Sequence, residues 1–524
     1  MTINESDRNL LSRYVSNLED DIYCLRNLPP EVVAVLFAYV SRSPNSFREN
    51  LLNLLKAGEI EITDKVGQSS ELPDANEFAT ANKKARQFHK KWVIGYGHAS
   101  VAEHADIKFA LENVSIIASK IIEDCRLASY TEKSTRYQVF SPPRYYKGEE
   151  IVKSPVGEDY IKTVEMLFAE YNALQTDAMN WLKSVNERES GIPEIAYETS
   201  VKAGACDIAR YLLPAATLTS IGVSTNAREA TWAITKFLSA PIKEINRIGA
   251  RMREEGGKIA PTLLKYAEKS PYIERTDKNT EALAKNLHRT ATFERWNEQK
   301  PSNTLVISDY DPKGEDKIIA ALLYRRLNEP FEILLKKVSG WNDSLKRSFL
   351  DEALSNIGAY DTPPRELELA TVTCDILIDF GAFRDIQRHR IATQIPQEET
   401  VAHGYESPPE LAEFGWEARF KTAMERARET FYKMEKETPL YARYVVPLAF
   451  RKRALISWNL RELFHFIRLR SSPQGHISYR RLAWSLYDEI VRIYPLLASY
   501  FLCDKTAAPL GRLASEIKRA NNKL

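Results

Sequence analysis

The stretch RYLLPAATLTSIGVSTNAR, Arg210–Arg228, returns in outline as RYVVPLAFRKRALISWNLR, Arg443–Arg461. Each copy opens with Arg-Tyr, carries a proline four residues after the arginine and ends on an Asn-x-Arg triplet. The spacing from the first arginine to the asparagine is the same in both copies, 16 residues (210 to 226 and 443 to 459). Two residue types at one spacing in one context do not recur by chance. We therefore interpret the chain as a divergent internal duplication.

The elements around this stretch recur in the same order. In the first half, alternation over Ile107–Glu112 predicts a strand, and apolar spacing over Val114–Cys125 predicts an amphipathic helix that ends at Arg126. In the second half, Leu367–Ile376 predicts a strand, and a short helix over Phe380–Ile386 follows it. The boundary falls near residue 270, which gives two domains, 1–270 and 271–524.

The rest of the sequence predicts mainly helices. Apolar residues recur at helical spacing, with prolines between them, so we expect two or three helices near the start of the chain. The other expected segments are a loop at 67–73, a helix at 82–95, a largely helical region to 264, a polar linker at 268–279, and helices at 315–338 and 344–355.

Composition limits the function classes. The 524 residues are 44% hydrophobic and 27% charged, as is usual for a globular protein, and the net charge of +2 gives no global basic field for nucleic acid. The 5 cysteines are scattered without a CxxC pair, which argues against disulfides or a zinc cluster. No targeting segment or apolar stretch of membrane-spanning length is found, so we expect a soluble, cytoplasmic protein.

Two stretches could hold an anion. Arg388, His389 and Arg390 stand side by side and repel one another unless an anion lies between them; arginine suits forked contacts with phosphate or carboxylate. Basic residues in the last turn of a helix also complement its dipole, so this stretch alone leaves both interpretations open. The segment RLASYTEKSTRY, Arg126–Tyr137, is too rich in Ser and Thr to extend a helix comfortably, and such segments can wrap an anion.

These motifs together resemble a family. GHASVAEH, Gly97–His104, and RLASYTEKSTRY are similar to the flavin-dependent thymidylate synthases, whose signature is RHR followed by x-x-S-x-x-x-x-S-x-R. Counted from Arg126, Ser129, Ser134 and Arg136 stand at +3, +8 and +10, as that signature requires. The resemblance implies an α/β (α+β) fold, with each half a small, mostly antiparallel sheet packed with long helices.

The two halves depart from the family signature in opposite ways. In the first half Asp124 and Cys125 replace the first Arg and His, and in the second half Glu398 and Thr400 replace the later Ser and Arg. The family also carries an arginine eleven residues after the Asn-x-Arg asparagine. Arg470 matches it on the same helix face as Asn459, whereas the first half has Phe237.

Family enzymes are homotetramers whose sites form between subunits, so the resemblance implies one complete composite site between the two halves. The implied flavin-binding residues are His98, Ser100, Glu103, Arg388, His389, Arg390, Asn459 and Arg461, and the implied nucleotide-binding residues are Glu132, Ser134, Arg136, Arg210, Arg388 and Arg470. Arg388, Arg470 and Ser134 are the implied catalytic residues. The reciprocal site would contain carboxylates where a phosphate should bind and should be inactive.

The implied activity is methylation of dUMP to dTMP with FAD, methylenetetrahydrofolate and reduced nicotinamide (NADPH), in a homodimer that forms a pseudo-tetramer. Cys125 lies in the degenerate site and is not read as a nucleophile. Two alternatives stay open, namely a flavoprotein acting on another pyrimidine nucleotide and a non-enzymatic nucleotide-binding scaffold. No partner nucleic acid or membrane is expected.

Several single residues have simpler interpretations. His98 and His104 flank Glu103, but no helical HExxH pattern accompanies them, so we expect no metal. Asn226 and Asn459 could cap helices instead of contacting a flavin. The other simple interpretations are that Phe237 packs in the core and that His465 lies in the core or near the flavin. Arg136 or Arg470 taken alone would be a salt-bridge partner.

Overall fold

The computed structural model describes residues 4–40, 43–56, 99–290, 305–358, 360–507 and 510–521. The chain forms two compact units. The first unit comprises residues 1–114, 121–132 and 219–293, and the second comprises 115–120, 133–218 and 294–524. The units follow contacts in space, so they mix residues of the two sequence halves. The division into domains 1–270 and 271–524 therefore stays a prediction about ancestry.

Three helices begin the first unit, as the apolar spacing predicts. They are α1 (Glu5–Ser12), α2 (Pro30–Val40) and α3 (Phe47–Lys56). Their buried apolar side chains, among them Leu11, Leu36 and Leu51, form one cluster. The expected loop at 67–73 and helix at 82–95 lie outside the described residues.

The sheet of the first unit has the strand order β1-β3-β2. The predicted strand is confirmed as β1 (Asp106–Ser115), and the predicted helix after it is the shorter α5 (Ile116–Ile122). Sequence reasoning missed β2 (Ala128–Glu132) and β3 (Leu218–Asn226), which pair antiparallel. Hydroxyl residues in both strands hide the period-2 pattern, but the β-branched ones among them suit a pleated strand.

Helices complete the first unit. They are the 3₁₀ turn η2 (Ala99–His104), α9 (Ala227–Leu238), α10 (Lys243–Ile259) and α11 (Pro271–Thr290). The polar stretch proposed as a linker is helical from Pro271 onward, which corrects that expectation. Exposed Tyr272, Leu283 and Leu287 lie among many charged residues on α11, so no apolar stripe stood out in the sequence.

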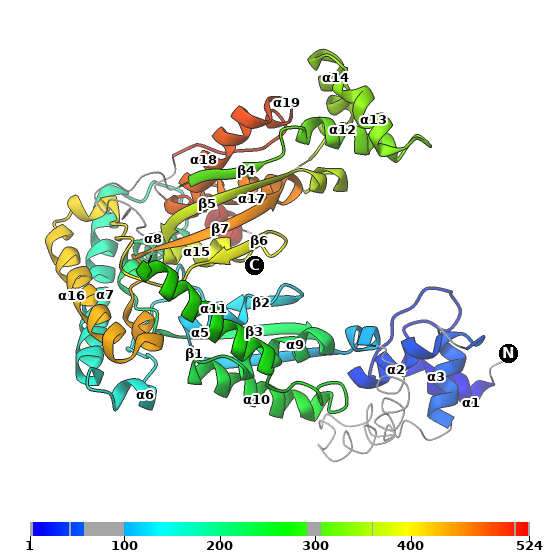
Figure 1. Ribbon diagram of the computed structural model, residues 1–524, viewed down its shortest axis with the longest axis horizontal. Helices are drawn as coiled ribbons and strands as arrows, with labels where there is room; N and C mark the ends of the chain where they lie inside the picture. The colour runs from blue at the N-terminus through cyan, green and yellow to red at the C-terminus, as the bar shows by residue number, and fades with distance from the viewer. Residues whose placement is uncertain are drawn as a thin grey trace. The chain divides into compact units, whose positions relative to one another are not determined.

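The sheet of the second unit has the strand order β4-β5-β7-β6, and every pairing in it is antiparallel. Its strands are β4 (Leu305–Tyr310), β5 (Thr371–Asp379), β6 (Thr393–Pro396) and β7 (Arg451–Asn459). The predicted strand Leu367–Ile376 corresponds to β5, which begins four residues later because η4 (Arg365–Leu369) precedes it. Figure 1 shows α15 (Phe380–Ile386), α17 (Leu460–Arg470) and α18 (Ile477–Ile493) beside these strands. Together the two sheets confirm the α+β class.

The remaining helices of the second unit come from both halves of the sequence. They are α6 (Glu149–Val152), α7 (Gly157–Val185), α8 (Glu194–Ala209), η3 (Arg210–Leu212), α12 (Gly314–Tyr324), α13 (Phe331–Ser339), α14 (Asp343–Leu354), η5 (Pro409–Ala412), α16 (Glu417–Glu437), η6 (Pro439–Val445), α19 (Pro495–Ala498) and α20 (Leu513–Asn521). The predicted helix 315–338 is interrupted after Tyr324, and a second helix begins at Phe331 with Pro330 at its N-cap. The long helices α7 and α16 lie side by side (Figure 1), where the hydroxyls of Thr163 and Thr430 are 2.7 Å apart.

The two Arg-Tyr stretches pair with each other through reciprocal backbone hydrogen bonds. The amide of Ala215 donates to the carbonyl of Val446 at 2.8 Å, and the amide of Leu448 donates to the carbonyl of Leu213 at 2.9 Å. The same exchange joins Ala216 to Tyr444 and Ala449 to Tyr211, at 2.8 and 3.0 Å. Residue i of one copy thus bonds residue j of the other in both directions, which is the mark of a twofold relation. In this region the two halves of the chain meet as two subunits would.

Both repeat asparagines cap helices. Asn226 accepts a hydrogen bond from the amide of Glu229 at 2.9 Å, and Asn459 accepts one from the amide of Glu462 at 2.8 Å. The helix-cap interpretation is thus confirmed at both positions.

We predict that Asn226→Ala and Asn459→Ala each lower the free energy of unfolding by about 1 kcal/mol, because each leaves a first-turn amide without its acceptor. Asn→Ser at either position should recover most of the loss. Urea denaturation followed by circular dichroism measures both. Equal losses for Ala and Ser would contradict the cap assignment.

Candidate functional site

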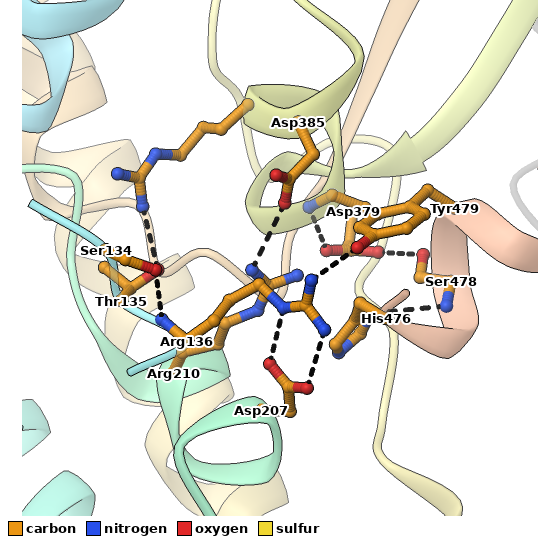
Figure 2. Close-up of polar contacts among 12 residues, drawn as sticks. Ser134, Thr135, Arg136, Asp207, Arg210, Asp379, Asp385, His476, Ser478 and Tyr479 are labelled. Carbon is orange, nitrogen blue, oxygen red and sulfur yellow. Dashed lines mark hydrogen bonds and ion pairs between the residues drawn. The ribbon is translucent and has the colours of Figure 1, made fainter. Parts of the chain in front are cut away.

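Arg136 is the centre of a buried cluster of charged side chains in the second unit (Figure 2). Its Nε and Nη2 donate to the two carboxylate oxygens of Asp207, at 2.8 and 2.9 Å, in a forked ion pair. Nη1 donates to the hydroxyl of Tyr479, and Nη2 also donates to the carbonyl of Gln474, at 3.1 Å. The Arg136 guanidinium is therefore held by α8 on one side and by the chain entering α18 on the other.

Asp207 is shared by two arginines. Its Oδ2 also accepts from Nη2 of Arg512, at 2.6 Å. Burial would raise the pKa of Asp207, but Arg136 and Arg512 outweigh burial and hold that pKa far below its usual range. Asp207 is thus a permanent carboxylate, and it fixes Arg136 in place.

Arg210 follows Asp207 by one helical turn and is 1% exposed. Its Nη1 lies 3.7 Å from a carboxylate oxygen of Asp385. Nε and Nη2 are buried and have no hydrogen-bond partner within the described part of the chain. A buried guanidinium with two unused donors lacks part of the compensation that burial requires, and an anionic ligand would supply it.

Asp385 receives arginines from both halves of the sequence. Nη1 of Arg470 lies 3.7 Å from its second oxygen. Burial would raise the pKa of this carboxyl, but Arg136, Arg210 and Arg470 outweigh burial, so that the pKa is about 2. The stretch Phe383–Arg390 thus contains an anion of its own, Asp385, which separates neighbouring cations.

His389 supports Arg470. Nε of Arg470 donates to Nε2 of His389 at 2.9 Å, and Nδ1 of His389 lies 3.0 Å from Oε1 of Glu462. An imidazole that accepts at Nε2 must carry its proton on Nδ1, so His389 is neutral and donates to Glu462. Burial, followed by Arg470, holds the pKa of His389 well below its usual value. Nη2 of Arg470 also donates to the carbonyl of Asp385 at 2.6 Å, which fixes the guanidinium plane.

Tyr479 links the two arginines that come from different halves. The guanidinium of Arg136 lies 5.4 Å from the centre of its ring, and that of Arg470 lies 5.3 Å from it. Ser134 joins the cluster through its hydroxyl oxygen, which accepts from the amide of Arg136 at 3.2 Å. Ser134, Arg136 and Arg210 from the first half are therefore brought into one cluster with Arg470 from the second half.

The three residues of Arg388–Arg390 do not act as one group. The helix that precedes them ends at Ile386, so the chain then turns. Arg388 is exposed, and its side chain makes no ion pair or hydrogen bond within the described residues, whereas His389 is buried and Arg390 is half-buried. The prediction of a single anion-binding triplet is therefore refined to one exposed cation, Arg388, beside a neutral imidazole.

Two of the other predicted site residues, Arg461 and Glu103, have partners within their own units. Arg461 donates to the carbonyl of Pro363 at 2.9 Å and pairs with Glu368 at 2.6 Å. In the first unit Glu103 pairs with Arg228, Ser100 is exposed and Glu132 is buried at the end of β2. His98 lies outside the described residues.

A carboxylate and a threonine occupy the positions at which the second half departs from the family signature. Arg443, the counterpart of Arg210, pairs with Glu398 and lies 3.9 Å from Glu399, which in turn pairs with the buried Lys452. Thr400 is half-buried, and its hydroxyl accepts from the amide of Ala402 at 3.2 Å.

In the first unit Asp124 pairs with Lys236, and Phe237 is buried as core. Burial raises the pKa of the Cys125 thiol to about 11, which keeps it protonated and unreactive. The sequence-based interpretation of Cys125 as no nucleophile agrees with this environment.

Sequence reasoning missed the residues that contact the cluster arginines or act on them electrostatically, namely Asp207, Asp385, Asp379, His476, Tyr479 and Arg512. Asp207 lies one helical turn before Arg210, and Asp385 lies inside the stretch that carries Arg388, so proximity to the motif arginines was the available signal. No group of three or more metal-ligating side chains is found among the described residues. None of the helices that the structure describes is long and apolar enough to cross a membrane.

Comparisons with known proteins identify the same family in both halves of the chain. A model of the family described as thymidylate synthase complementing protein matches residues 45–262 and 305–496, one segment in each half. A UPF0159 protein of Chlamydia pneumoniae is 33% identical over 523 residues, which cover 97% of this chain and 96% of that protein. A flavin-dependent thymidylate synthase of Thermococcus kodakarensis is 31% identical over 200 residues, 38% of this chain and 71% of that protein. The Helicobacter pylori flavin-dependent thymidylate synthase structure with FAD and dUMP covers 39% of this chain and all of its own, with 20% identity and a TM-score of 0.29.

We predict a pH dependence from Asp379, which is fully buried and caps α15 by accepting from the amide of Ala382 at 2.7 Å. Burial raises its pKa to about 6, although Arg210 and a hydrogen bond from Ser478 act in the opposite direction. The unfolded pKa is about 3.9, so the folded state holds the proton more tightly. This contribution to stability is fully present below about pH 4 and is lost as the pH rises through about 6.

Asp379→Asn should remove that loss. Relative to the variant, the free energy of unfolding of the natural protein should fall by up to about 3 kcal/mol from pH 4 to pH 7. Ser478→Ala removes a group that lowers the Asp379 pKa, so the decline should extend to higher pH. Urea midpoints measured across this range test both variants, and parallel curves for all three proteins would contradict the prediction.

Proposed function

Because this chain belongs to the thymidylate synthase complementing protein family, we propose that it is a tandem flavin-dependent thymidylate synthase with one composite site. It methylates dUMP to dTMP with FAD, methylenetetrahydrofolate and NADPH, in the cytoplasm, as a homodimer with four half-chain lobes. The observation that carries the proposal is the cluster in which Arg136 and Arg210, from the first half, surround Asp385 together with Arg470, from the second half.

The phosphate of dUMP fits the charge of this cluster. Four arginines, Arg136, Arg210, Arg470 and Arg512, are opposed by two carboxylates, Asp207 and Asp385. Asp379, whose pKa is about 6, adds a third carboxylate near Arg210 at neutral pH. The remaining excess of one positive charge favours an anion, and a phosphomonoester carries about −1.5 to −2 at pH 7. Nε and Nη2 of Arg210 are the donors that await it. The Ser134 hydroxyl accepts a hydrogen bond from an amide and still has its own proton to donate.

The pyrimidine would be polarised by Arg470. Its guanidinium is fixed by His389 and by the Asp385 carbonyl, so it needs no reorganisation when negative charge develops on the ring. The neutral state of His389 matters here, because an imidazolium would repel Arg470 and would offer it no acceptor. Glu462 therefore acts on Arg470 through His389, as a positioning residue.

The residues proposed for FAD fit it unequally. Arg388 fits best, because it is an exposed cation without an ion pair in the described part of the chain. Asn459 and Arg461 are already engaged, as a helix cap and with Glu368, so their contribution would be to shape the wall. FAD, when bound, supplies the methylene-transfer and hydride chemistry, and a neighbouring cation such as Arg388 favours its anionic reduced form.

The carboxylates near Arg443, the counterpart of Arg210 in the other copy, support one active site per chain. Glu398 and Glu399 already neutralise Arg443, and their carboxylates would repel a phosphate that approached it. Burial raises the pKa of Glu399, but Lys452 and Arg443 outweigh burial and lower it, so this carboxyl is charged.

We predict that Arg210→Gln weakens dUMP binding by about 10- to 100-fold, the worth of hydrogen bonds to a charged group. Arg443→Gln is the matched control, since Arg443 stands at the same place in the other copy and is already neutralised. It should leave dUMP binding unchanged. Isothermal titration calorimetry measures both affinities, and equal losses would refute the assignment of the phosphate to Arg210.

We predict that the purified protein is yellow and releases tritium from 5-labelled dUMP when methylenetetrahydrofolate and NADPH are supplied. Arg388→Ala should abolish the release, because it removes the exposed cation proposed for the flavin and the pyrimidine. Asp124→Ala, in the degenerate copy, should not.

Other outcomes separate the alternatives. A colourless protein that binds dUMP without tritium release would be a nucleotide-binding scaffold. A yellow protein that another pyrimidine nucleotide stabilises more than dUMP in a thermal-shift assay would act on that nucleotide instead. Either result would overturn the proposed activity.

A further inference from the structure

The second unit contains a cavity of about 490 Å³ that the proposed reaction does not use. It lies between α8, the chain that enters α18 and the segment before α20. Its apolar wall includes Leu182, Ile208, Tyr211, Ile477 and Trp484. Its volume is in the range of sites that enclose a small organic molecule.

The cavity adjoins the cluster around Arg136, because Asp207 and Gln474, which both accept hydrogen bonds from Arg136, line it. Oδ2 of Asp207, which lines the cavity, accepts from Arg136 at 2.9 Å and from Arg512 at 2.6 Å. Arg512 lines the cavity and Arg136 does not. Part of the wall, Lys505, Leu510 and Arg512, lies beyond residue 496, where the family match ends. The lining residues up to position 484 lie within the matched segments.

Arg512 brings an unused donor to the wall. Its side chain is 7% exposed, and its Nε is buried without a hydrogen-bond partner within the described residues. The carboxylate that pairs with Arg512 is Asp207, which also pairs with Arg136. The charge of Arg512 is therefore only partly compensated by the protein.

Arg480 is a second buried cation on the same wall. It is 3% exposed, and it donates to the carbonyls of Ser471 and Thr506, at 2.9 and 2.6 Å. Carbonyls satisfy its hydrogen bonds but carry no formal charge. Glu406 and Lys505 also line the cavity. Glu406 pairs with Arg451 and Lys505 pairs with Asp488, and neither partner lines the cavity.

Glu410 and Arg481 complete the charged lining. Glu410 is half-buried, and burial raises its pKa, which favours its neutral form. Arg481 is exposed and lowers that pKa. Arg480, Arg481 and Arg512 outnumber Asp207 and Glu410, so the wall carries more positive than negative charge.

We propose that this cavity binds a small organic anion, a carboxylate on an apolar body about the size of an aromatic ring. The carboxylate is compensated by Arg512 and Arg480, and the apolar body packs among Ile477, Trp484 and their neighbours. A neutral molecule of the same shape gains only the apolar contacts, so charge is what the site selects. The proposal needs neither flavin nor nucleotide. The cavity shares Asp207 and Arg512 with the cluster around Arg136, so the two sites adjoin.

Phenylacetate is the probe, and phenylacetamide, its neutral isostere, is the matched control ligand. We expect one phenylacetate to bind per chain by isothermal titration calorimetry, with a change in tryptophan fluorescence that Trp484→Phe removes. Phenylacetamide should bind at least about tenfold more weakly, a difference of about 1.4 kcal/mol. Equal binding of the two ligands, or no saturable binding of phenylacetate, would overturn the proposal.

Two variants locate the site. Ala507→Trp places a large ring at an exposed position of the lining, so it should block the probe while the fold is retained. Arg512→Lys keeps the charge but removes the Nε donor, and it should weaken phenylacetate more than phenylacetamide. Arg492→Gln, an exposed arginine paired with Glu489 and outside the lining, is the control. Unchanged phenylacetate binding in Ala507→Trp would place the probe elsewhere and refute the proposal, whereas dUMP binding tests the nucleotide site separately.

Discussion

The reciprocal backbone pairing of the two Arg-Tyr stretches is the constraint on which the rest of the second unit depends. Four hydrogen bonds of 2.8–3.0 Å join the stretches, and all four are buried among apolar residues such as Leu213 and Leu448. The amide of Gly381, near the start of α15, donates to the carbonyl of Leu448 at 3.0 Å, so the helix that leads to Arg388 begins on this pairing. Arg210 stands at its other edge. A Cβ on Gly381 would lie 3.1 Å from Asp379 and 3.5 Å from the Arg210 guanidinium, which explains the glycine there.

This pairing brings cations together, and the chain manages their repulsion in three ways. Asp207 and Asp385 supply charge, Tyr479 supplies an aromatic face to two guanidiniums, and His389 is kept neutral. The pKa of each carboxyl is set by the balance between burial and the arginines. The arginines lower the pKa of Asp207 and of Asp385 more than burial raises it. At Asp379 burial has the larger effect, because Arg210 is the arginine that acts on it. The compensation of Arg210 is incomplete, because two of its nitrogens have no acceptor in the described structure.

Local helices of this arrangement could be predicted from the sequence, whereas the contacts between distant residues could not. The helix Phe380–Ile386 was predicted at its observed bounds, since an apolar run after a strand is a local signal. The strands β2 and β3 were missed because their hydroxyl residues, among them Ser129 and Ser224, hide the apolar alternation of a strand. The partners of Arg136 could not be read from any pattern, because Asp207 and Tyr479 lie 71 and 343 positions away. Arginine motifs were visible, but the carboxylates that hold them depend on which segments meet in space.

The two copies are symmetric in their backbone and asymmetric in their side chains, and this asymmetry bears on function. Arg210 and Arg443 stand at equivalent places in the pairing. Arg443 pairs with Glu398 and lies 3.9 Å from Glu399, whereas the ion pair of Arg210 with Asp385 is 3.7 Å long and leaves two of its nitrogens without an acceptor in the described structure. A buried guanidinium without enough anionic partners destabilises the fold unless a ligand compensates it. In an assembly of identical subunits every substitution alters all sites, so a glutamate that neutralises one arginine neutralises each of its copies. Duplication within one chain removes that coupling, and it lets one copy satisfy its arginine permanently while the other leaves donors available for an anion.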